Sequence, residues 1–217
     1  MSDWNMSGLI LEGISGTGKT TLINSMLRTN SFTEKTYLSS IILSEHHTQR
    51  VLEKKEREQG LTREDNIRLL NSHVNYISSL YSQLDQMSWC RKKSTAMRIP
   101  YLLERFHLTH VFHYSHIGWE DVREIDEKLA ALDCRLCVLT IDRPSIFQRV
   151  IGRKDEAWQN YISRFGTSAD RIADHFEKQQ DTLLELTEKT VLPVLQVDTS
   201  LLPPAESTGR IIEFWNI

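Results

Sequence analysis

Eight consecutive residues near the start of the chain have the types and spacing needed to bind phosphates: Gly13-Ile14-Ser15-Gly16-Thr17-Gly18-Lys19-Thr20. They fit the pattern G-x-x-x-x-G-K-[ST] of the loops that hold the phosphates of ATP and GTP. Glycines let the backbone wrap closely around an anion, so that successive N–H groups point inward at it. A helix that begins at Lys19 adds the positive end of its dipole at the same place.

The motif predicts a role for each part of this phosphate-binding loop. We expect ATP to bind along the whole stretch and at the following Thr21, largely through backbone N–H groups. Lys19 would reach the β- and γ-phosphates, and the Thr20 hydroxyl would bind Mg²⁺. ATP is therefore the expected phosphoryl donor and Mg²⁺ the expected metal.

The residues on either side of the loop supply the setting that the motif requires. Leu9-Ile10-Leu11 is a short apolar run suited to a buried parallel strand, and residues 21–27 continue as an amphipathic helix. An ordinary glycine-rich turn is the alternative, but the order strand, loop, helix favours phosphate binding.

Length and composition narrow the class of protein. The 217 residues suit one large domain, which we place at 1–217. A net charge of -3 gives no overall attraction to nucleic acid or to an anionic membrane, so we expect neither as a partner. No apolar run approaches the ~20 residues of a membrane span, residues 1–5 lack signal-peptide features, and three cysteines suggest no disulfide framework. We therefore expect a cytoplasmic protein.

Apolar runs alternate with helical patterns along the chain. Strands are predicted near 9–11, 37–43, 99–103, 136–141 and 194–197. Helical stretches separate them, including 49–59, 107–114 and a long amphipathic helix over 62–87. This alternation predicts an α/β domain with a parallel sheet and right-handed crossovers.

In such a sheet, ligands bind at the carboxyl ends of the strands, so the residues that follow each strand carry the chemistry. The first strand ends in the phosphate-binding loop, the second near Glu45, and the third at Glu104-Arg105. We expect these side chains to lie close together. The alternatives are a surface ion pair for Glu104 and Arg105 and a solvated loop for Glu45.

Several segments resemble thymidylate kinases and deoxynucleoside kinases. Leu11-Glu12-Gly13 followed by Gly18-Lys19-Thr20-Thr21 resembles the F-E-G…G-K-T-T opening of thymidylate kinases. Glu104-Arg105-Phe106, followed by Thr109, His110, His113 and Tyr114, resembles their D-R-Y…S-S…Y-Q segment. The acidic–arginine pair also resembles the E-R-S motif of deoxynucleoside kinases, and 149–156 is similar to their R-x-x-x-R lid. The resemblance implies a three-layer P-loop NTPase fold, with a five-stranded parallel sheet flanked by helices and a short helical lid at about 145–165.

The resemblance also implies catalytic roles. Glu104 would help to hold Mg²⁺ and its waters, and Arg105 would contact the acceptor. Arg149 and Arg153 would close over the ATP phosphates and stabilise charge on the transferring group. Glu45 would accept the proton of the attacking hydroxyl. Because Arg149 and Arg153 lie four residues apart, an exposed helix face is the alternative for that pair.

The histidines and cysteines allow a second set of interpretations. The resemblance to the thymidylate kinase segment implies that His110 and His113, together with Thr109, line the acceptor pocket. A metal site is less consistent with the pattern, because histidines three residues apart on a helix drift around it and cannot share one face. Cys134-x-x-Cys137 enters a strand without a second pair, which favours packed thiols over a zinc or redox site.

Two departures from the thymidylate kinase pattern concern the acceptor. Those enzymes carry an acidic residue where this chain has Ser15, and R-E-P where it has Ser44-Glu45-His46. The missing arginine removes one cation for an acceptor phosphate, whereas the carboxylate suited to a hydroxyl remains.

We therefore predict an ATP- and Mg²⁺-dependent phosphotransferase that acts on a nucleoside or a nucleoside monophosphate. Two alternatives stay open: a kinase of a non-nucleoside alcohol such as an antibiotic or metabolite, and a non-catalytic nucleotide-binding regulatory module. A guanine-binding N-K-x-D segment does not follow the strand at 136–141. The partners would be ATP and a small acceptor, with a homodimer possible through the helix at 62–87.

Overall fold

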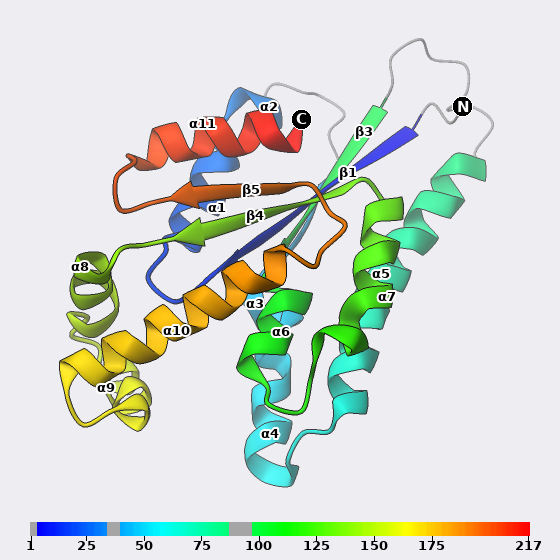
Figure 1. Cartoon of the computed structure of the whole chain (residues 1–217). Coiled ribbons are helices and arrows are strands. Elements are labelled where there is room, and N and C mark those ends of the chain that lie inside the picture. The colour runs from blue at the N-terminus through cyan, green and yellow to red at the C-terminus, as the bar shows by residue number, and fades with distance from the viewer. Residues whose placement is uncertain (1–3, 34–39, 87–96) are drawn as a thin grey trace.

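The computed structural model describes residues 4–33, 40–86 and 97–217. Within these residues five strands form one parallel sheet in the order β2-β3-β1-β4-β5 (Figure 1). The strands are β1 (Trp4–Gly13), β2 (Ile41–Leu43), β3 (Met97–Glu104), β4 (Cys134–Thr140) and β5 (Val194–Asp198). The predicted five-stranded parallel sheet is confirmed.

Strand boundaries differ most from the sequence prediction at β1 and β2, and by one or two residues at the other strands. β1 begins five residues earlier than the apolar run at 9–11, because β3 pairs with it from Trp4 to Leu11 and backbone pairing does not require an apolar side chain. Of the predicted strand at 37–43, the structure gives strand to Ile41–Leu43, whereas 37–39 lie outside the described residues.

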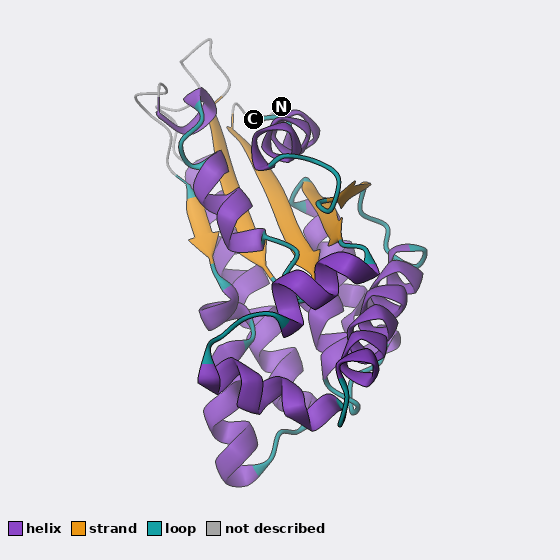
Figure 2. Ribbon diagram, turned by 90° about the vertical axis from the view of Figure 1, so that its left-hand side faces the viewer, coloured by secondary structure: helices purple, strands orange, loops and turns teal. Residues whose placement is uncertain are grey.

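Helices cover both faces of the sheet, as Figure 2 shows from the side. One face packs against α1 (Lys19–Met26) and α11 (Pro204–Trp215) through a cluster that includes Leu9, Leu11 and Ile211. The other face carries four helices: α5 (Arg63–Gln86), α6 (His107–His113), α7 (Trp119–Ala131) and α10 (Ala169–Thr187). The expected three-layer arrangement follows, since each face of a buried parallel sheet must be covered.

The long helix α5 follows its predicted amphipathic pattern. Leu70, Val74 and Ile77 are buried against the sheet, at the three- and four-residue steps that keep side chains on one helical face. Asp65 accepts hydrogen bonds from the backbone N–H and the hydroxyl of Thr62, which caps the start of the helix.

Short helices gather beyond the carboxyl ends of the strands. They are α3 (Glu45–Thr48), η1 (Arg50–Leu52), α4 (Glu53–Gln59), α8 (Arg143–Ile146), η3 (Phe147–Ile151), α9 (Glu156–Ile162) and η4 (Ser163–Phe165). The short helix α2 (Asn30–Thr33) lies at the opposite end of the sheet, where Phe32 packs against Trp215 of α11 (Figure 1). The segment 143–165, at the position of the predicted lid, packs on α10 through a separate apolar cluster that includes Ile146, Val150 and Phe176. Among the described helices, none combines the length and apolar character needed to cross a bilayer.

Candidate active site

The strand order brings the predicted site residues to one edge of the sheet. β1 lies between β3 and β4, and Leu11 of β1 pairs with Glu104 of β3. The phosphate-binding loop and Glu104-Arg105 therefore leave the sheet side by side, at the point where the strand order reverses. A cleft of about 840 Å³ opens there, lined by residues of the loop, α3, η1, α4, the β3 exit and the segment 143–165.

The phosphate-binding loop has a backbone that only glycine adopts easily. Gly13 and Gly16 have φ values of 147° and 86°, in the region that strains residues with a side chain. A Cβ atom on Gly13 would lie 2.8 Å from the carbonyl oxygen of Leu139, and one on Gly16 would lie 2.7 Å from Cγ2 of Val150. The hydroxyl of Thr17 donates to the carbonyl of Ile14 at 2.9 Å and closes the loop.

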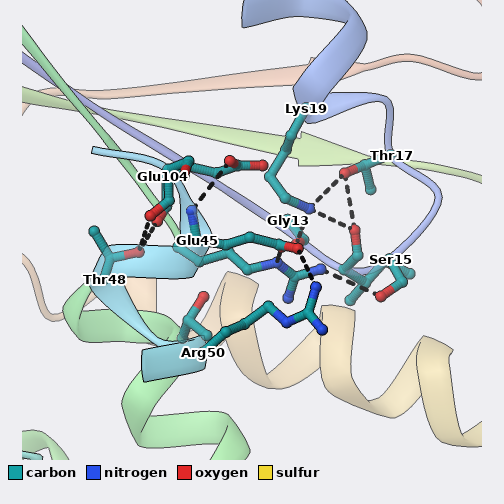
Figure 3. A network of polar contacts seen from close by, with 12 residues as sticks. Gly13, Ser15, Thr17, Lys19, Glu45, Thr48, Arg50 and Glu104 are labelled. Atoms are coloured by element: carbon teal, nitrogen blue, oxygen red, sulfur yellow. Dashed lines mark hydrogen bonds and ion pairs between the residues drawn. The ribbon is translucent and has the colours of Figure 1, made fainter. Parts of the chain in front are cut away.

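Lys19 is folded back onto this loop (Figure 3). Its Nζ donates to the carbonyl oxygens of Gly13 at 2.8 Å and Ile14 at 2.9 Å. Burial of the ammonium group, followed by the nearby charge of Arg105, lowers the pKa of Lys19 to about 7. A phosphate in the cleft would supply the negative charge that this buried amine lacks. Thr20 and Thr21, at the start of α1, also line the cleft.

Glu104 lies on the side of Lys19 that is away from Thr17 (Figure 3), and it is 4% exposed. Its carboxylate accepts from the backbone N–H of Glu45 at 3.2 Å, and its backbone carbonyl accepts from the Thr48 hydroxyl (Figure 3). Glu104 and Thr20 both line the cleft. Carboxylate and hydroxyl oxygens suit Mg²⁺, and substrate phosphates and water normally complete its octahedral shell. These two residues therefore fit the predicted metal site.

Arg105 connects the loop to α3. Its Nε lies 2.8 Å from a carboxylate oxygen of Glu45, and its Nη2 donates to the Ser15 hydroxyl at 3.2 Å. The second carboxylate oxygen of Glu45 lies 3.6 Å from Nη1 of Arg50. Because the Arg105 side chain is only 13% exposed, its ion pair belongs to the cleft wall and not to the open surface.

The two arginines of the predicted lid reach the cleft from the segment 143–165. Arg149 belongs to the π-helical turn η3, a kind of turn that is frequent at functional sites. Its Nη2 donates to the carbonyl of Thr199 at 3.0 Å, next to the phosphate-binding loop. The guanidinium of Arg153 lies 4.6 Å from the centroid of the Trp158 ring. Both arginines line the cleft.

Two predicted acceptor ligands lie elsewhere. Thr109 and His110 are fully buried in α6 and do not line the cleft. Thr109 donates to Glu12 through its backbone N–H and its hydroxyl. The ring nitrogens of His110 each lie 2.8 Å from an oxygen of Asn66 or Thr48, so no ring nitrogen is left for an acceptor. The prediction that Thr109 and His110 line the acceptor pocket is therefore wrong, because their polar atoms already bind partners within the protein.

His113, the third predicted acceptor ligand of α6, does line the cleft. Its ring packs edge-on against Tyr114 with centroids 4.8 Å apart. Burial, followed by the charge of Arg105, lowers the pKa of His113, which favours a neutral ring at pH 7.

Two further histidines and two cysteines pack or pair within the protein and do not line the cleft. His107 pairs with Asp126 at 2.8 Å, and His116 lies 2.9 Å from the Asn66 amide. Cys134 and Cys137 are free buried thiols, as expected for packed cysteines, and burial raises the pKa of each.

Sequence reasoning missed much of the cleft wall. Gln49, Arg50 and Glu53 line it, with Arg50 Nε 2.8 Å from Glu53. Aromatic and basic side chains complete the wall: Phe112, Trp158, Tyr161, Arg164 and Phe176. The only signal for the first group was its place just after the exit of β2. Trp158, Tyr161 and Arg164 fall within the predicted lid, whereas Phe112 and Phe176 had no signal.

A second cavity of about 320 Å³ lies on the other side of the phosphate-binding loop. Gly16, Gly18, Thr21 and Arg149 line both cavities. Its other walls include Thr199, Leu202 and Pro204. A ligand that lies along the loop therefore has access to both cavities.

Comparison with known proteins is informative only at the level of structure. No protein-family model and no curated protein sequence matches the chain. A solved structure of the Bacillus subtilis YorR protein, in complex with phosphorylated GDP, has a TM-score of 0.58 and 15% identity, covering 96% of this chain and 95% of that one. Shikimate kinase from Bacteroides thetaiotaomicron gives a TM-score of 0.54 and 14% identity, covering 97% and 98%. The chain therefore has a P-loop kinase-like fold.

Proposed function

We propose that this protein is an ATP- and Mg²⁺-dependent phosphotransferase that moves the γ-phosphate of ATP to a hydroxyl group of a small molecule, with a nucleoside as the favoured acceptor. One observation carries the proposal: the phosphate-binding loop, the Glu104 carboxylate and the Arg105–Glu45 pair line one cleft. A protein that only binds a nucleotide would not need the Arg105–Glu45 pair.

The donor would lie along the phosphate-binding loop. Its triphosphate would take the backbone N–H groups of the loop and the ammonium of Lys19, while its base extends into the smaller cavity beyond Thr21 and Thr199. Thr20 and Glu104 would hold Mg²⁺, which when bound neutralises charge on the β- and γ-phosphates.

The charges at the acceptor end favour a hydroxyl over a phosphate. Arg105 and Arg50 are the cations nearest to Glu45, and the carboxylate of Glu45 pairs with both. A phosphate monoester would have to displace that carboxylate from its arginines. A neutral alcohol would instead use Glu45 as an acceptor for its proton, and the ring faces of Tyr161 and Phe112 suit a planar base.

The reaction follows from this arrangement. Glu45 takes the proton of the acceptor hydroxyl, whose oxygen attacks the γ-phosphorus in line. The bond from that phosphorus to the bridging oxygen breaks, and ADP leaves with the electron pair. Lys19, Arg149 and Arg153 stabilise the negative charge on the transferring group. Arg149 would exchange its bond to Thr199 for one to the phosphates.

The experiment is a screen of nucleosides, nucleoside monophosphates and other hydroxyl-bearing metabolites with ATP and Mg²⁺, read by ADP formation and by mass spectrometry of the product. We expect acceptor-dependent ADP formation and a product heavier by one phosphate. Lys19→Ala is the inactive control, and Lys128→Ala is a matched control because Lys128 pairs with Glu124 at 2.8 Å on the exposed part of α7.

Each outcome of the screen decides between the alternatives. Transfer only to monophosphates would overturn the hydroxyl assignment. Transfer only to a non-nucleoside alcohol would keep the chemistry and change the acceptor class. Nucleotide binding without transfer to any acceptor would favour the regulatory module and overturn the proposal.

A further inference from the structure

Glu12 is a buried carboxylate next to the phosphate-binding loop that has no role in the proposed reaction. It is the penultimate residue of β1, is 0% exposed and does not line the cleft. One carboxylate oxygen accepts from the backbone N–H groups of Phe106 at 2.9 Å and Thr109 at 3.2 Å. The other oxygen accepts from the Thr109 hydroxyl. The carboxylate is thus directed at the start of α6 and away from any ligand.

These bonds fix the backbone on both sides of Arg105. The N–H of Arg105 donates to the carbonyl of Leu11 at 3.1 Å, and the next N–H, that of Phe106, donates to Glu12. Between the two bonds, Arg105 has a φ of 52°. A residue with a side chain adopts this left-handed conformation at a cost in free energy, and it persists where the surroundings impose it. The end of β1 provides those surroundings.

The imposed backbone directs the Arg105 side chain. From this position the guanidinium reaches the Ser15 hydroxyl of the phosphate-binding loop and the Glu45 carboxylate of α3. We propose that Glu12 is a positioning residue: by holding the Phe106 and Thr109 N–H groups, it keeps Arg105 aimed at the acceptor end of the cleft. The catalytic meaning of this inference rests on the proposed function, because Arg105 is assigned there to the acceptor.

A purely structural role for Glu12 is the competing interpretation, and Asp126 supplies the matched control. Asp126 is also a buried carboxylate, 1% exposed, with three donors. It accepts from His107 at 2.8 Å, from the Thr190 hydroxyl at 2.5 Å and from the Val191 N–H at 2.9 Å. It therefore anchors the same helix α6, but it does not contact the backbone around Arg105.

The test compares Glu12→Ala, Glu12→Gln and Asp126→Asn in the full chain. The first readout is the NMR signal of the Arg105 Nε–H group, assigned by its loss in Arg105→Ala. We expect Glu12→Ala to move this signal to the position of a solvent-exposed arginine. Glu12→Gln should keep it near the wild-type position, since the amide oxygen still accepts both N–H groups. Asp126→Asn should lower stability and leave the signal in place.

The second readout is kinetic. A misplacement of about 1 Å costs on the order of 100-fold in rate, so Glu12→Ala should lower kcat/KM for the acceptor by about that factor while the Kd for ADP is unchanged. In an Arg105→Ala background, Glu12→Ala should have no further effect on acceptor kinetics, because its effect passes through Arg105.

An unmoved Arg105 signal in folded Glu12→Ala would overturn the positioning role, as would an equal change in Asp126→Asn. If Glu12→Ala does not fold, Glu12→Asp makes the same test, because the shorter side chain cannot hold all three donors. The two proposals can fail separately. If the wild-type protein transfers phosphate to no acceptor, the proposed function is refuted. If the Arg105 signal still moves in Glu12→Ala, the positioning role is supported all the same.

Discussion

The two ends of the cleft are built in different ways. At the donor end, one contiguous stretch of the chain makes the phosphate-binding loop, whose glycines have positive φ and whose carbonyls bind Lys19. At the acceptor end, side chains come from separate segments, with Glu45 in α3, Arg105 after β3 and Tyr161 in α9. Under the proposed function, binding of a phosphate would be a local property of this chain, whereas choice of an acceptor would depend on how distant segments meet.

Lys19→Ala should produce the largest effect and disable the donor end alone. Loss of the ammonium removes the charge that would stabilise the transferring phosphate, so kcat should fall by about 1,000-fold or more. Steady-state kinetics with circular dichroism on the same sample measures both activity and fold. Turnover near that of the Lys128→Ala control would refute the assignment of the phosphate-binding loop.

Glu45→Gln should disable the acceptor end by a different route. The amide keeps the size of the side chain but cannot take the proton of the attacking hydroxyl, so kcat should fall by about 100-fold or more. The Kd for ADP, measured by calorimetry, should stay unchanged. A mutant with normal kcat would show that Glu45 only pairs with Arg50 and Arg105.

Arg105→Ala should give a smaller loss confined to the acceptor. A hydrogen bond from a charged group contributes about 1.5–3 kcal/mol, which corresponds to about 10- to 150-fold in kcat/KM for the acceptor. The KM for ATP should change less than that for the acceptor, because Arg105 acts on the donor end only through its charge and the Ser15 hydroxyl, whereas Lys19 keeps its bonds to the Gly13 and Ile14 carbonyls. Equal losses for both substrates would mean that the two ends of the cleft are not separable.

The pH dependence of ATP binding should give the smallest effect over a single pH unit and report on the donor end. The pKa of Lys19 is about 7 in the empty cleft, and a bound triphosphate would raise it. Above pH 7 the free protein has lost this proton and must take one up on binding, so affinity should fall by up to about tenfold per pH unit as the pH rises. Calorimetry in buffers of different ionisation enthalpy measures the proton uptake.

Lys19→Arg is the control for this pH effect, because a guanidinium keeps its proton throughout the range. Its affinity for ATP should therefore not weaken in this way as the pH rises. A wild-type protein that takes up no proton between pH 7 and 9 would contradict the assigned cause.

The sequence predicted the fold better than it predicted the acceptor end. Apolar runs and helical periodicity located the five strands and the long helix α5, because both patterns follow from burial on one side of an element. The predicted helix at 49–59 is divided between η1 and α4, with Gln49 outside helical geometry at φ -136°. The resemblance to thymidylate kinases placed Thr109 and His110 near the acceptor. Matched positions carry no information about which way each side chain of α6 points.

Glu12 and Glu104 illustrate the same limit at the level of single residues. Both carboxylates lie at the end of a buried strand and both are almost fully buried. Glu104 faces the cleft, whereas Glu12 is directed at the N–H groups of α6. The same residue type at the end of a strand therefore has different contacts, which the neighbouring strand and helix decide.

By itself, the sequence determined the phosphate-binding loop and the α/β fold. A loop of N–H groups needs only the dihedral angles that adjacent glycines allow, and the sheet needs only the alternation of apolar strands with helices. The tertiary structure alone decided which side chains meet Arg105, what Glu12 holds and which part of α6 faces the cleft. Those contacts join residues up to 97 positions apart, and only the order of the strands and the rotation of each helix bring them together.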